Sequence, residues 1–200
     1  MKTNYDKVLE DIINGLKGRK PSLLLHSCCA PCSTAVITRL KDYFDVTIFY
    51  YNPNIEPLEE YLKRKEEQKR IVSEFGIKFL DCDYENEKFK SMSKGLEDLP
   101  EGGYRCHKCY ELRLTKTALT AKENNFLYFG TTLTVSPYKN SQVLNAIGKD
   151  IEELTKVKFL YSDFKKKEGY KLSMELSKKY NLYRQNYCGC IYSKKQSEQN

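Results

Sequence analysis

The sequence predicts an α/β fold, a mostly parallel sheet flanked by helices, and three observations support this prediction. Short apolar runs of strand length alternate with longer segments of helical periodicity. The chain has 200 residues, of which 40% are hydrophobic and 30% charged, which is enough for one sizeable core. No internal repeat or linker-like stretch divides the sequence. We therefore expect a single domain over residues 1–200, with a basic, tyrosine-rich C-terminal segment, residues 164–200, packed on it.

The predicted strands are short apolar or alternating runs. Residues 22–26 are a compact apolar run typical of a buried strand, and residues 45–51 alternate until Asn-Pro-Asn breaks the pattern. In chain order, the predicted strands are residues 22–26, 45–51, 77–80, 126–130 and 157–160. Because helical segments separate these runs, we expect βαβ units and parallel pairing.

The predicted helices lie between these strands. The first is a short amphipathic segment ended by glycine, and the second begins near Pro31, since the first turn of a helix tolerates proline. In chain order, the predicted helices are residues 5–18, 34–43, 57–75, 84–95, 105–124, 142–155 and 169–180. Residues 99–103 have the composition of a loop, and residues 131–140 are polar and turn-rich. The tail at residues 193–200 is expected to contribute little.

Three motifs follow strand ends and are therefore expected on one edge of the sheet. Cys28 and Cys29 follow the first strand, residues 52–54 follow the second, and Thr131 follows the fourth. Parallel sheets bind ligands outside the carboxyl ends of their strands. The sequence therefore predicts a site at this edge.

The charge of the chain is concentrated at its C-terminal end. The formal net charge is +7, and residues 164–200 carry nine lysines and arginines against three glutamates, with five tyrosines interleaved. Clustered cations with aromatic residues suit a phosphate backbone with unstacked bases, as in RNA. A solvated lysine-rich helix face is the alternative explanation.

Composition also excludes one broad class of protein. The mean hydropathy is −0.66, and no apolar run approaches the roughly 20 residues needed to span a bilayer, which argues against an integral membrane protein. Residues 1–6 are polar and show no signal-peptide pattern, so we expect a cytoplasmic protein.

Eight cysteines form three clusters and one isolated position. The clusters are Cys28, Cys29 and Cys32; Cys106 and Cys109; and Cys188 and Cys190. In a chain without an export signal, such clusters indicate metal or thiol chemistry rather than a disulfide scaffold. Four thiolates can hold zinc or an iron–sulfur cluster. The sulfurs of adjacent cysteines are expected to diverge, which favours a four-iron cube, with zinc or plain buried cysteines as alternatives.

The remaining thiols and one histidine allow several interpretations. A Cys-Gly-Cys sequence such as 188–190 can close a strained, easily reduced disulfide, and glycine permits the unusual backbone. The alternatives are a second metal bound together with Cys32, or a structural role. Cys82 is expected to be a buried bystander. His26 is expected to be a core residue that could also tune a cluster.

These motifs together resemble the QueH family of epoxyqueuosine reductases. The resemblance covers about residues 22–193 and is carried by six segments in the same order. They are Leu25–Ser33, Tyr51–Ile55, Arg105–Tyr110, Thr131–Asn140, Asp163–Lys166 and Tyr183–Cys190. The resemblance implies a nucleotide-binding fold of the HUP type and reduction of the epoxide of epoxyqueuosine, at the tRNA wobble base, to queuosine. It also implies a cobalamin-independent enzyme and a tRNA partner, and it leaves the electron donor unidentified.

The resemblance further implies a set of site residues. The ligands of a [4Fe-4S] cluster would be Cys28, Cys29, Cys106 and Cys109, with Cys32 a candidate for a second metal. Catalytic candidates are Cys188 and Cys190, the proposed redox-active pair, together with Tyr51 and Tyr138. Tyr51, Tyr138 and Lys139 are candidate proton donors. Candidate substrate contacts are Asn52, Asn54, Thr131, Thr132, Lys139, Asn140, Lys165, Lys166, Arg184 and Gln185.

Two other functions compete with this interpretation. The first is a tRNA-thiolating or nucleotide-activating enzyme on a similar sheet, but residues 27–31 lack the glycines of a phosphate loop. The second is a non-catalytic zinc-binding RNA module, which explains Cys106 and Cys109 but neither of the other cysteine clusters.

Overall fold

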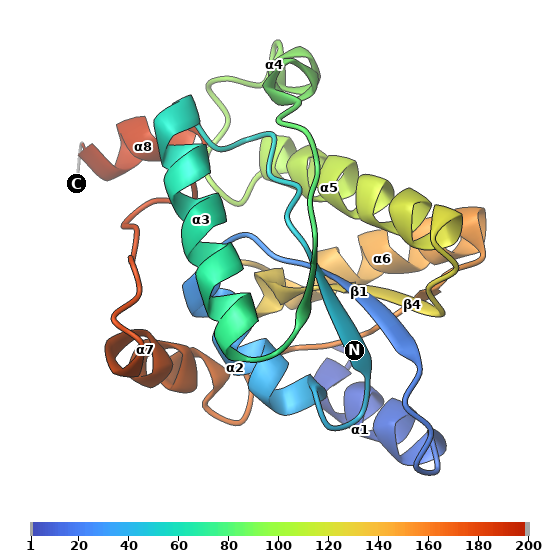
Figure 1. Cartoon of the computed structure of the whole chain (residues 1–200). Helices are drawn as coiled ribbons and strands as arrows, with labels where there is room; N and C mark the ends of the chain where they lie inside the picture. Colours follow the sequence, from blue (N-terminus) through green and yellow to red (C-terminus); the bar gives the residue numbers. More distant parts are fainter. Residues whose placement is uncertain (1, 199–200) are drawn as a thin grey trace.

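The computed structural model describes residues 2–198 and contains a five-stranded parallel sheet (Figure 1). The strands are β1 (Ser22–His26), β2 (Asp45–Phe49), β3 (Lys78–Leu80), β4 (Tyr128–Thr131) and β5 (Lys158–Phe159), in the order β3-β2-β1-β4-β5. The α/β prediction is confirmed, and all five strands were predicted to within a few residues. The architecture is compatible with the HUP-type sheet that the resemblance implies. Residues 1, 199 and 200 of the predicted domain lie outside the described part.

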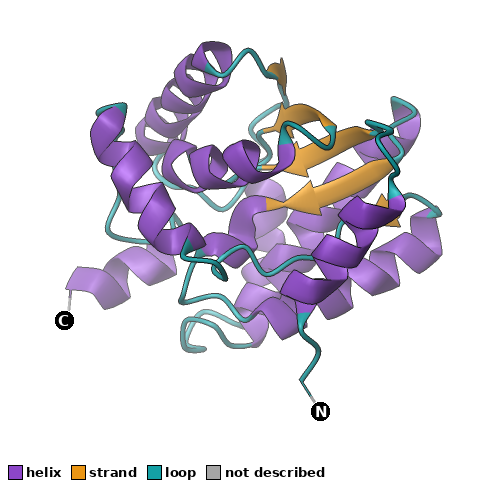
Figure 2. Cartoon of the chain, turned by 90° about the horizontal axis from the view of Figure 1, so that it is seen from below, coloured by secondary structure: helices purple, strands orange, loops and turns teal. Residues whose placement is uncertain are grey.

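Helices cover both faces of the sheet (Figures 1 and 2). They are α1 (Tyr5–Gly15), α2 (Ala30–Leu40), α3 (Leu58–Glu74), α4 (Asn86–Ser93), α5 (Tyr104–Glu123), α6 (Ser141–Thr155), α7 (Gly169–Lys179) and α8 (Ile191–Glu198). Along β1, Leu23 and Leu25 pack with residues of α1, α2 and α3, whereas Leu24 packs with residues of α5 and α6. This alternation buries β1 on both faces, as its uninterrupted apolar sequence predicts.

The strand register brings the predicted motifs to one edge. His26, the last residue of β1, pairs with Phe49 at the end of β2 and with Thr131 at the end of β4. The segments after these three strands therefore begin side by side, which confirms the shared edge expected from the sequence.

Two short helices differ from the predictions. Residues 132–135, expected in a turn-rich segment, form a 3₁₀ helix in which all four residues are buried. The tail was expected to be unimportant, but it contains α8, and Ser193 of this helix is 3% exposed. Tertiary contacts stabilise α8, and short-range periodicity does not signal them.

The C-terminal segment packs against α2 and α3. Helix α7 lies on α2, and the Tyr183 hydroxyl donates to Glu60 of α3 at 3.1 Å. The backbone N–H of Tyr183 donates to Glu67 of α3 at 2.9 Å. Within residues 2–198, no helix is both long and apolar enough to cross a membrane.

Candidate metal and redox site

The first cysteine group lies where β1 turns into α2. Cys29 is extended (φ −170°, ψ 158°) and caps α2, so Cys32 lies one turn into the helix beside it. The Cys28 and Cys29 sulfurs are 3.7 Å apart, and the three sulfurs, with that of Cys32, lie within 4.8 Å of one another. The expectation that adjacent sulfurs diverge was wrong, because the Cys28 and Cys29 sulfurs lie within contact distance of each other and of the Cys32 sulfur. This separation matches the ~3.8 Å edge of a tetrahedral metal–thiolate site. The group can bind a metal ion.

The other two cysteine pairs meet at a second point. Cys106 and Cys109 lie in the first turns of α5, and Cys188 and Cys190 come from the segment before α8. These four residues line a cavity of about 20 Å³ together with Asn54. The Cys106 sulfur accepts from the backbone N–H of Gly102 at 3.3 Å. The fold therefore joins two cysteine pairs that lie about 80 residues apart in the sequence.

The Cys188–Cys190 segment is held closely against α3 and its preceding loop. Gly189 has φ +129°, and a β-carbon there would lie 2.8 Å from Ile55 and 3.1 Å from Arg64. Its carbonyl accepts from the N–H of Glu56 at 2.9 Å. Arg64 donates to the carbonyl of Cys188 at 3.1 Å. The expected need for glycine is confirmed, for steric as well as conformational reasons.

Ser193 supports this segment from the other side. Its hydroxyl accepts from the N–H of Cys188 at 3.0 Å and donates to Glu101 at 3.0 Å, and its own N–H donates to the Cys190 sulfur at 3.4 Å. The expectation that the tail contributes little is therefore wrong for Ser193. All eight cysteines are free thiols.

Arg113 connects the two cysteine groups. It is 1% exposed on α5, and its guanidinium donates to Asn52 Oδ1 at 2.6 Å, His26 Nε2 at 3.3 Å and Cys109 Sγ at 3.9 Å. Burial lowers its pKa, but the thiols of Cys109, Cys28 and Cys188 outweigh burial and raise the pKa overall. This buried cation thus contacts a sulfur of the second cluster directly, and the thiols of the other two clusters contribute to its raised pKa.

His26 is a buried neutral residue, as expected. Its Nδ1 lies 3.0 Å from the Thr131 hydroxyl, and its Nε2 lies 3.0 Å from the carbonyl of Tyr51. Burial, followed by the charge of Arg113, lowers its pKa to about 3. His26 therefore links the ends of β1, β2 and β4 without carrying a charge.

The thiols differ in their tendency to ionise. Hydrogen bonds from Cys29 and Cys32 lower the pKa of Cys28 well below its usual value, and Lys139 and Arg113 reinforce the shift. The hydrogen bond to Cys28 raises the pKa of Cys29 to about 11. Burial raises the pKa of Cys109 to about 11 and that of Cys190 to about 12. Cys28 is thus the thiol of this group that most favours the thiolate.

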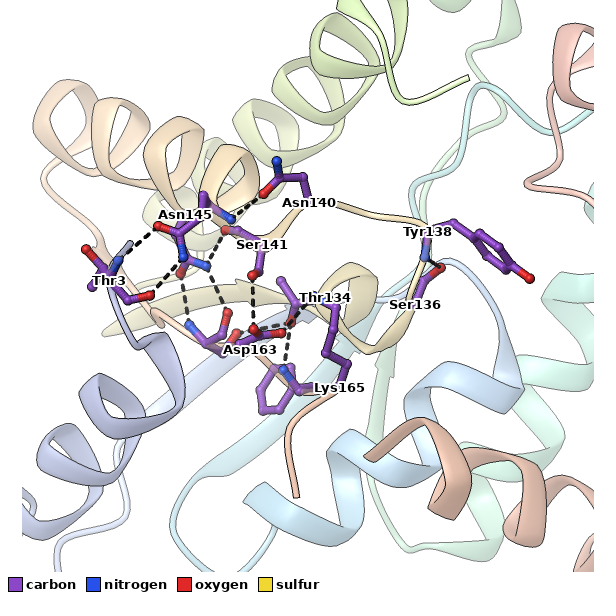
Figure 3. Close-up of polar contacts among 12 residues, drawn as sticks. Thr3, Thr134, Ser136, Tyr138, Asn140, Ser141, Asn145, Asp163 and Lys165 are labelled. Atoms are coloured by element: carbon purple, nitrogen blue, oxygen red, sulfur yellow. Dashed lines mark hydrogen bonds and ion pairs between the residues drawn. The ribbon is translucent and has the colours of Figure 1, made fainter. Parts of the chain in front are cut away.

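The three candidate proton donors occupy different environments. Tyr51 is buried and stacked on Phe49, with ring centroids 6.1 Å apart, and burial raises its pKa. Tyr138 is 81% exposed and points away from the neighbouring polar contacts (Figure 3). Burial lowers the pKa of Lys139, but the thiols of Cys188 and Cys28 reverse the shift and raise it. Lys139 is the candidate that interacts most directly with the cysteines.

Some of the side chains predicted to contact the substrate base already have hydrogen-bond partners within the protein, and others do not. Asn52 Nδ2 donates to the carbonyl of Ser27 at 2.8 Å, and Asn52 Oδ1 accepts from Arg113, so its amide is used internally. Asn54 is 1% exposed and its Oδ1 has no partner among the described residues. Thr132 lies with its hydroxyl 3.9 Å from the Cys28 sulfur. The Thr131 hydroxyl accepts from the N–H of Leu133 at 3.1 Å.

A polar groove of about 590 Å³ adjoins the site beside the start of α6. Its lining includes the predicted contacts Tyr138, Lys139, Asn140, Lys165 and Lys166. Lys165 pairs with Asp163 at 2.8 Å, and Asp163 accepts from Ser141 at 3.0 Å (Figure 3). Lys166 is exposed. Lys139 lines this groove, and the thiols of Cys188 and Cys28 raise its pKa.

The tyrosines of the C-terminal segment are packed rather than free. All five are half-buried, and the Tyr187 hydroxyl, for example, donates to the carbonyl of Glu56 at 3.1 Å. Arg184 is exposed and donates to Ser177 at 3.1 Å, whereas Gln185 has a buried Oε1 without a partner in the described residues. Base stacking by these tyrosines stays a prediction.

Sequence reasoning missed two buried arginines. Arg113 follows Cys109 by four residues, so both lie on the same helix face, and this spacing was the available signal. Arg64 lies within a strongly charged helix and gave no comparable signal. Cys82 is half-buried, and the groups with the largest effect on its pKa, after burial, are Lys116 and Glu85 rather than another cysteine.

Comparisons with known proteins find relatives over nearly the whole chain. A family model described as epoxyqueuosine reductase QueH matches residues 23–196. A protein of that name from Staphylococcus epidermidis is 46% identical, over 96% of this chain and 85% of its own length. The Streptococcus pyogenes protein is 43% identical over 97% of this chain and 79% of its own. The Thermotoga maritima protein is 39% identical over 86% of this chain and 90% of its own.

Proposed function

Because this chain belongs to the epoxyqueuosine reductase QueH family, we propose that it reduces epoxyqueuosine to queuosine on tRNA, in queuosine biosynthesis. The joining of Cys106 and Cys109 to Cys188 and Cys190 in one cavity carries this proposal, together with Arg113 of the same helix, which contacts the Cys109 sulfur at 3.9 Å. The epoxide takes up two electrons and two protons, both C–O bonds break, and an alkene and water form. We place the reaction in the cytoplasm, together with its tRNA substrate.

We propose that Cys28, Cys29, Cys106 and Cys109 hold a [4Fe-4S] cluster, with Cys32 beside it as a ligand for a second metal. The donor types suit such a cluster, since all four are thiols and Arg113 and Lys139 have no carboxylate partner in the ion pairs of residues 2–198. The sulfurs of Cys28 and Cys29 group with that of Cys32, and Cys106 and Cys109 line the separate cavity, so the cluster would have to bridge the two groups. An anionic metal–thiolate centre would balance both cations. Such a cluster supplies single electrons when bound.

Cys188 and Cys190 would supply reducing equivalents as a dithiol. Oxidation to one disulfide releases two electrons and two protons, which balances the reduction of one epoxide. Both residues line the cavity shared with Cys106 and Cys109, so the distance for transfer is short. A low-potential electron donor, still unidentified, must then restore the dithiol after each turnover.

The chain also has to protonate the leaving oxygen. Lys139 suits this role because it lines the groove and carries a protonated ammonium group. An alkoxide is a poor leaving group, and a positioned acid removes that barrier. Tyr51 and Tyr138 remain weaker candidates because of their burial and exposure, respectively.

The groove and the rim would bind the substrate. Asn54 offers its unpartnered amide oxygen and Thr132 its hydroxyl to the base and its diol. The Thr131 hydroxyl is already engaged by Leu133 and His26, so it would position the rim rather than bind the base. Asn140, Lys165 and Lys166 line the groove and would contact the phosphates of the anticodon stem-loop. Arg184 and Gln185 lie outside the lining of this groove and stay candidate contacts to another part of the tRNA.

A single-turnover assay on epoxyqueuosine-containing tRNA tests the function. Anaerobically purified protein with a chemical reductant should form queuosine, and Cys188→Ser should abolish turnover while leaving iron and sulfide unchanged. Cys82→Ser is the matched control and should retain activity. A colourless protein with one zinc and no product would refute the proposal, and full activity of Cys188→Ser would remove the dithiol role.

A further inference from the structure

Arg113 is buried without a negatively charged side chain to balance it. It is 1% exposed, and its three side-chain contacts are an amide oxygen, an imidazole nitrogen and a sulfur. No carboxylate pairs with it among residues 2–198, whereas the equally buried Arg64 pairs with Glu60 at 2.7 Å. An uncompensated buried charge costs several kcal/mol. Among the described residues, the acidic groups with the largest electrostatic effect on Arg113 are thiols, and one of them, Cys109, lies in contact with it at 3.9 Å.

The contacts of Arg113 fix its charge at one place. Asn52 and His26 hold the guanidinium from the ends of two strands, and both side chains are themselves fully buried. This charge is therefore rigidly positioned toward the cysteine centre.

We propose that Arg113 is a positioning residue that supplies the fixed positive charge of the metal–thiolate centre and raises its reduction potential. This inference rests on the proposed function, because it requires a cluster on the cysteines. Each electron taken up adds one negative charge to the four-thiolate centre, and a nearby fixed cation stabilises the reduced form more than the oxidised form. Hydrogen bonds to the sulfurs and net charge are the protein's means of setting such potentials.

The test compares three variants by a redox titration of the cluster, followed by electron paramagnetic resonance. Arg113→Gln removes the charge, Arg113→Lys keeps it but loses the forked hydrogen bonds, and Arg39→Gln is the control. Arg39 is a half-buried arginine at the far end of α2 whose ion-pair partner is Asp6. Thermal unfolding shows which variants fold.

We expect Arg113→Gln to lower the ratio of reduced to oxidised cluster at least tenfold at a given potential. For a one-electron couple, this is a midpoint lower by about 59 mV. Arg113→Lys should fall between this variant and the wild type, and Arg39→Gln should match the wild type. A loaded Arg113→Gln variant with an unchanged midpoint overturns the inference.

Two further outcomes also decide the question. Arg113→Gln can fold and still bind no cluster. In that case, an Arg113→Lys variant that binds the cluster with a lowered midpoint potential supports the proposed role of Arg113. If Arg113→Lys also binds no cluster, the proposed role is overturned. A wild-type protein without iron and sulfide refutes the proposed cofactor and this inference together. If the wild type binds the cluster and all variants have the same midpoint potential as the wild type, only the role of Arg113 is refuted.

Discussion

The substitution Gly189→Ala tests how the Cys188–Cys190 segment is positioned. Gly189 has φ +129°, a conformation in which a side-chain-bearing residue is strained by about 1–3 kcal/mol. The added β-carbon would also lie 2.8 Å from Ile55 and 3.1 Å from Arg64, both of which are 1% exposed. Such overpacking costs about 1–3 kcal/mol. The segment should therefore detach locally rather than absorb the methyl group.

The magnitude follows from these two contributions. Their lower sum, about 2 kcal/mol, raises the population of the detached state about thirty-fold. Cys190 is 7% exposed in the native state, so its alkylation reports the detached population. We expect the alkylation rate of Cys190, measured by mass spectrometry, to rise about thirty-fold, and queuosine formation to fall accordingly.

Gly95→Ala is the matched control for this experiment. Gly95 also has a positive φ, +78°, but a β-carbon there meets no atom within 4 Å. It should show only the backbone strain, about 1–2 kcal/mol, and leave Cys190 protected. If Cys190 of Gly189→Ala is alkylated at the wild-type rate and the variant forms queuosine at the wild-type rate, the close packing of this segment does not position the thiols.

Three other substitutions test the groove, the core and the C-terminal contacts. Lys166→Gln should weaken tRNA binding, because one phosphate contact is lost. The slope of the logarithm of the binding constant against the logarithm of the salt concentration should become shallower by about 0.7–0.9. Gly148→Ala should lower the free energy of unfolding in urea by about 1–2 kcal/mol, since its β-carbon would lie 2.3 Å from the Phe159 ring. Arg70 holds the pKa of Glu67 below its usual 4.5, so Glu67 stabilises the fold above about pH 4.5 and this stabilisation is lost as the pH falls further. The unfolding difference between the wild type and Glu67→Gln should therefore shrink toward zero below pH 4.5.

Each of these tests has a nearby control. Lys78→Gln removes an exposed lysine from β3 and should leave tRNA binding unchanged. Gly15→Ala adds a methyl group at the end of α1, where nothing lies within 4 Å, and should not destabilise the protein. Glu74→Gln removes a carboxylate whose ion pair within residues 2–198 is with Arg70. Equal effects in a test variant and its control would contradict the corresponding structural argument.

The local pattern of the sequence determined the sheet and most of its helices. Apolar runs and glycine or proline positions depend on neighbours within a few residues, so the strand at Ser22–His26 was predicted at both its ends. The cysteine motifs and their family resemblance were likewise visible, because they are short and ordered along the chain. The helix α8 was missed, since its stability comes from contacts with distant residues.

The tertiary structure alone decided which of these pieces act together. Strand order brings the ends of β1, β2 and β4 side by side, and this placed Arg113 against His26, Asn52 and Cys109. It also joined Cys106 and Cys109 to Cys188 and Cys190 in one cavity. No short-range pattern encodes these contacts, because they depend on how side chains from distant segments fill the same space. The sequence thus determined the chemistry that the residues offer, and the packing of the fold decided which of them meet.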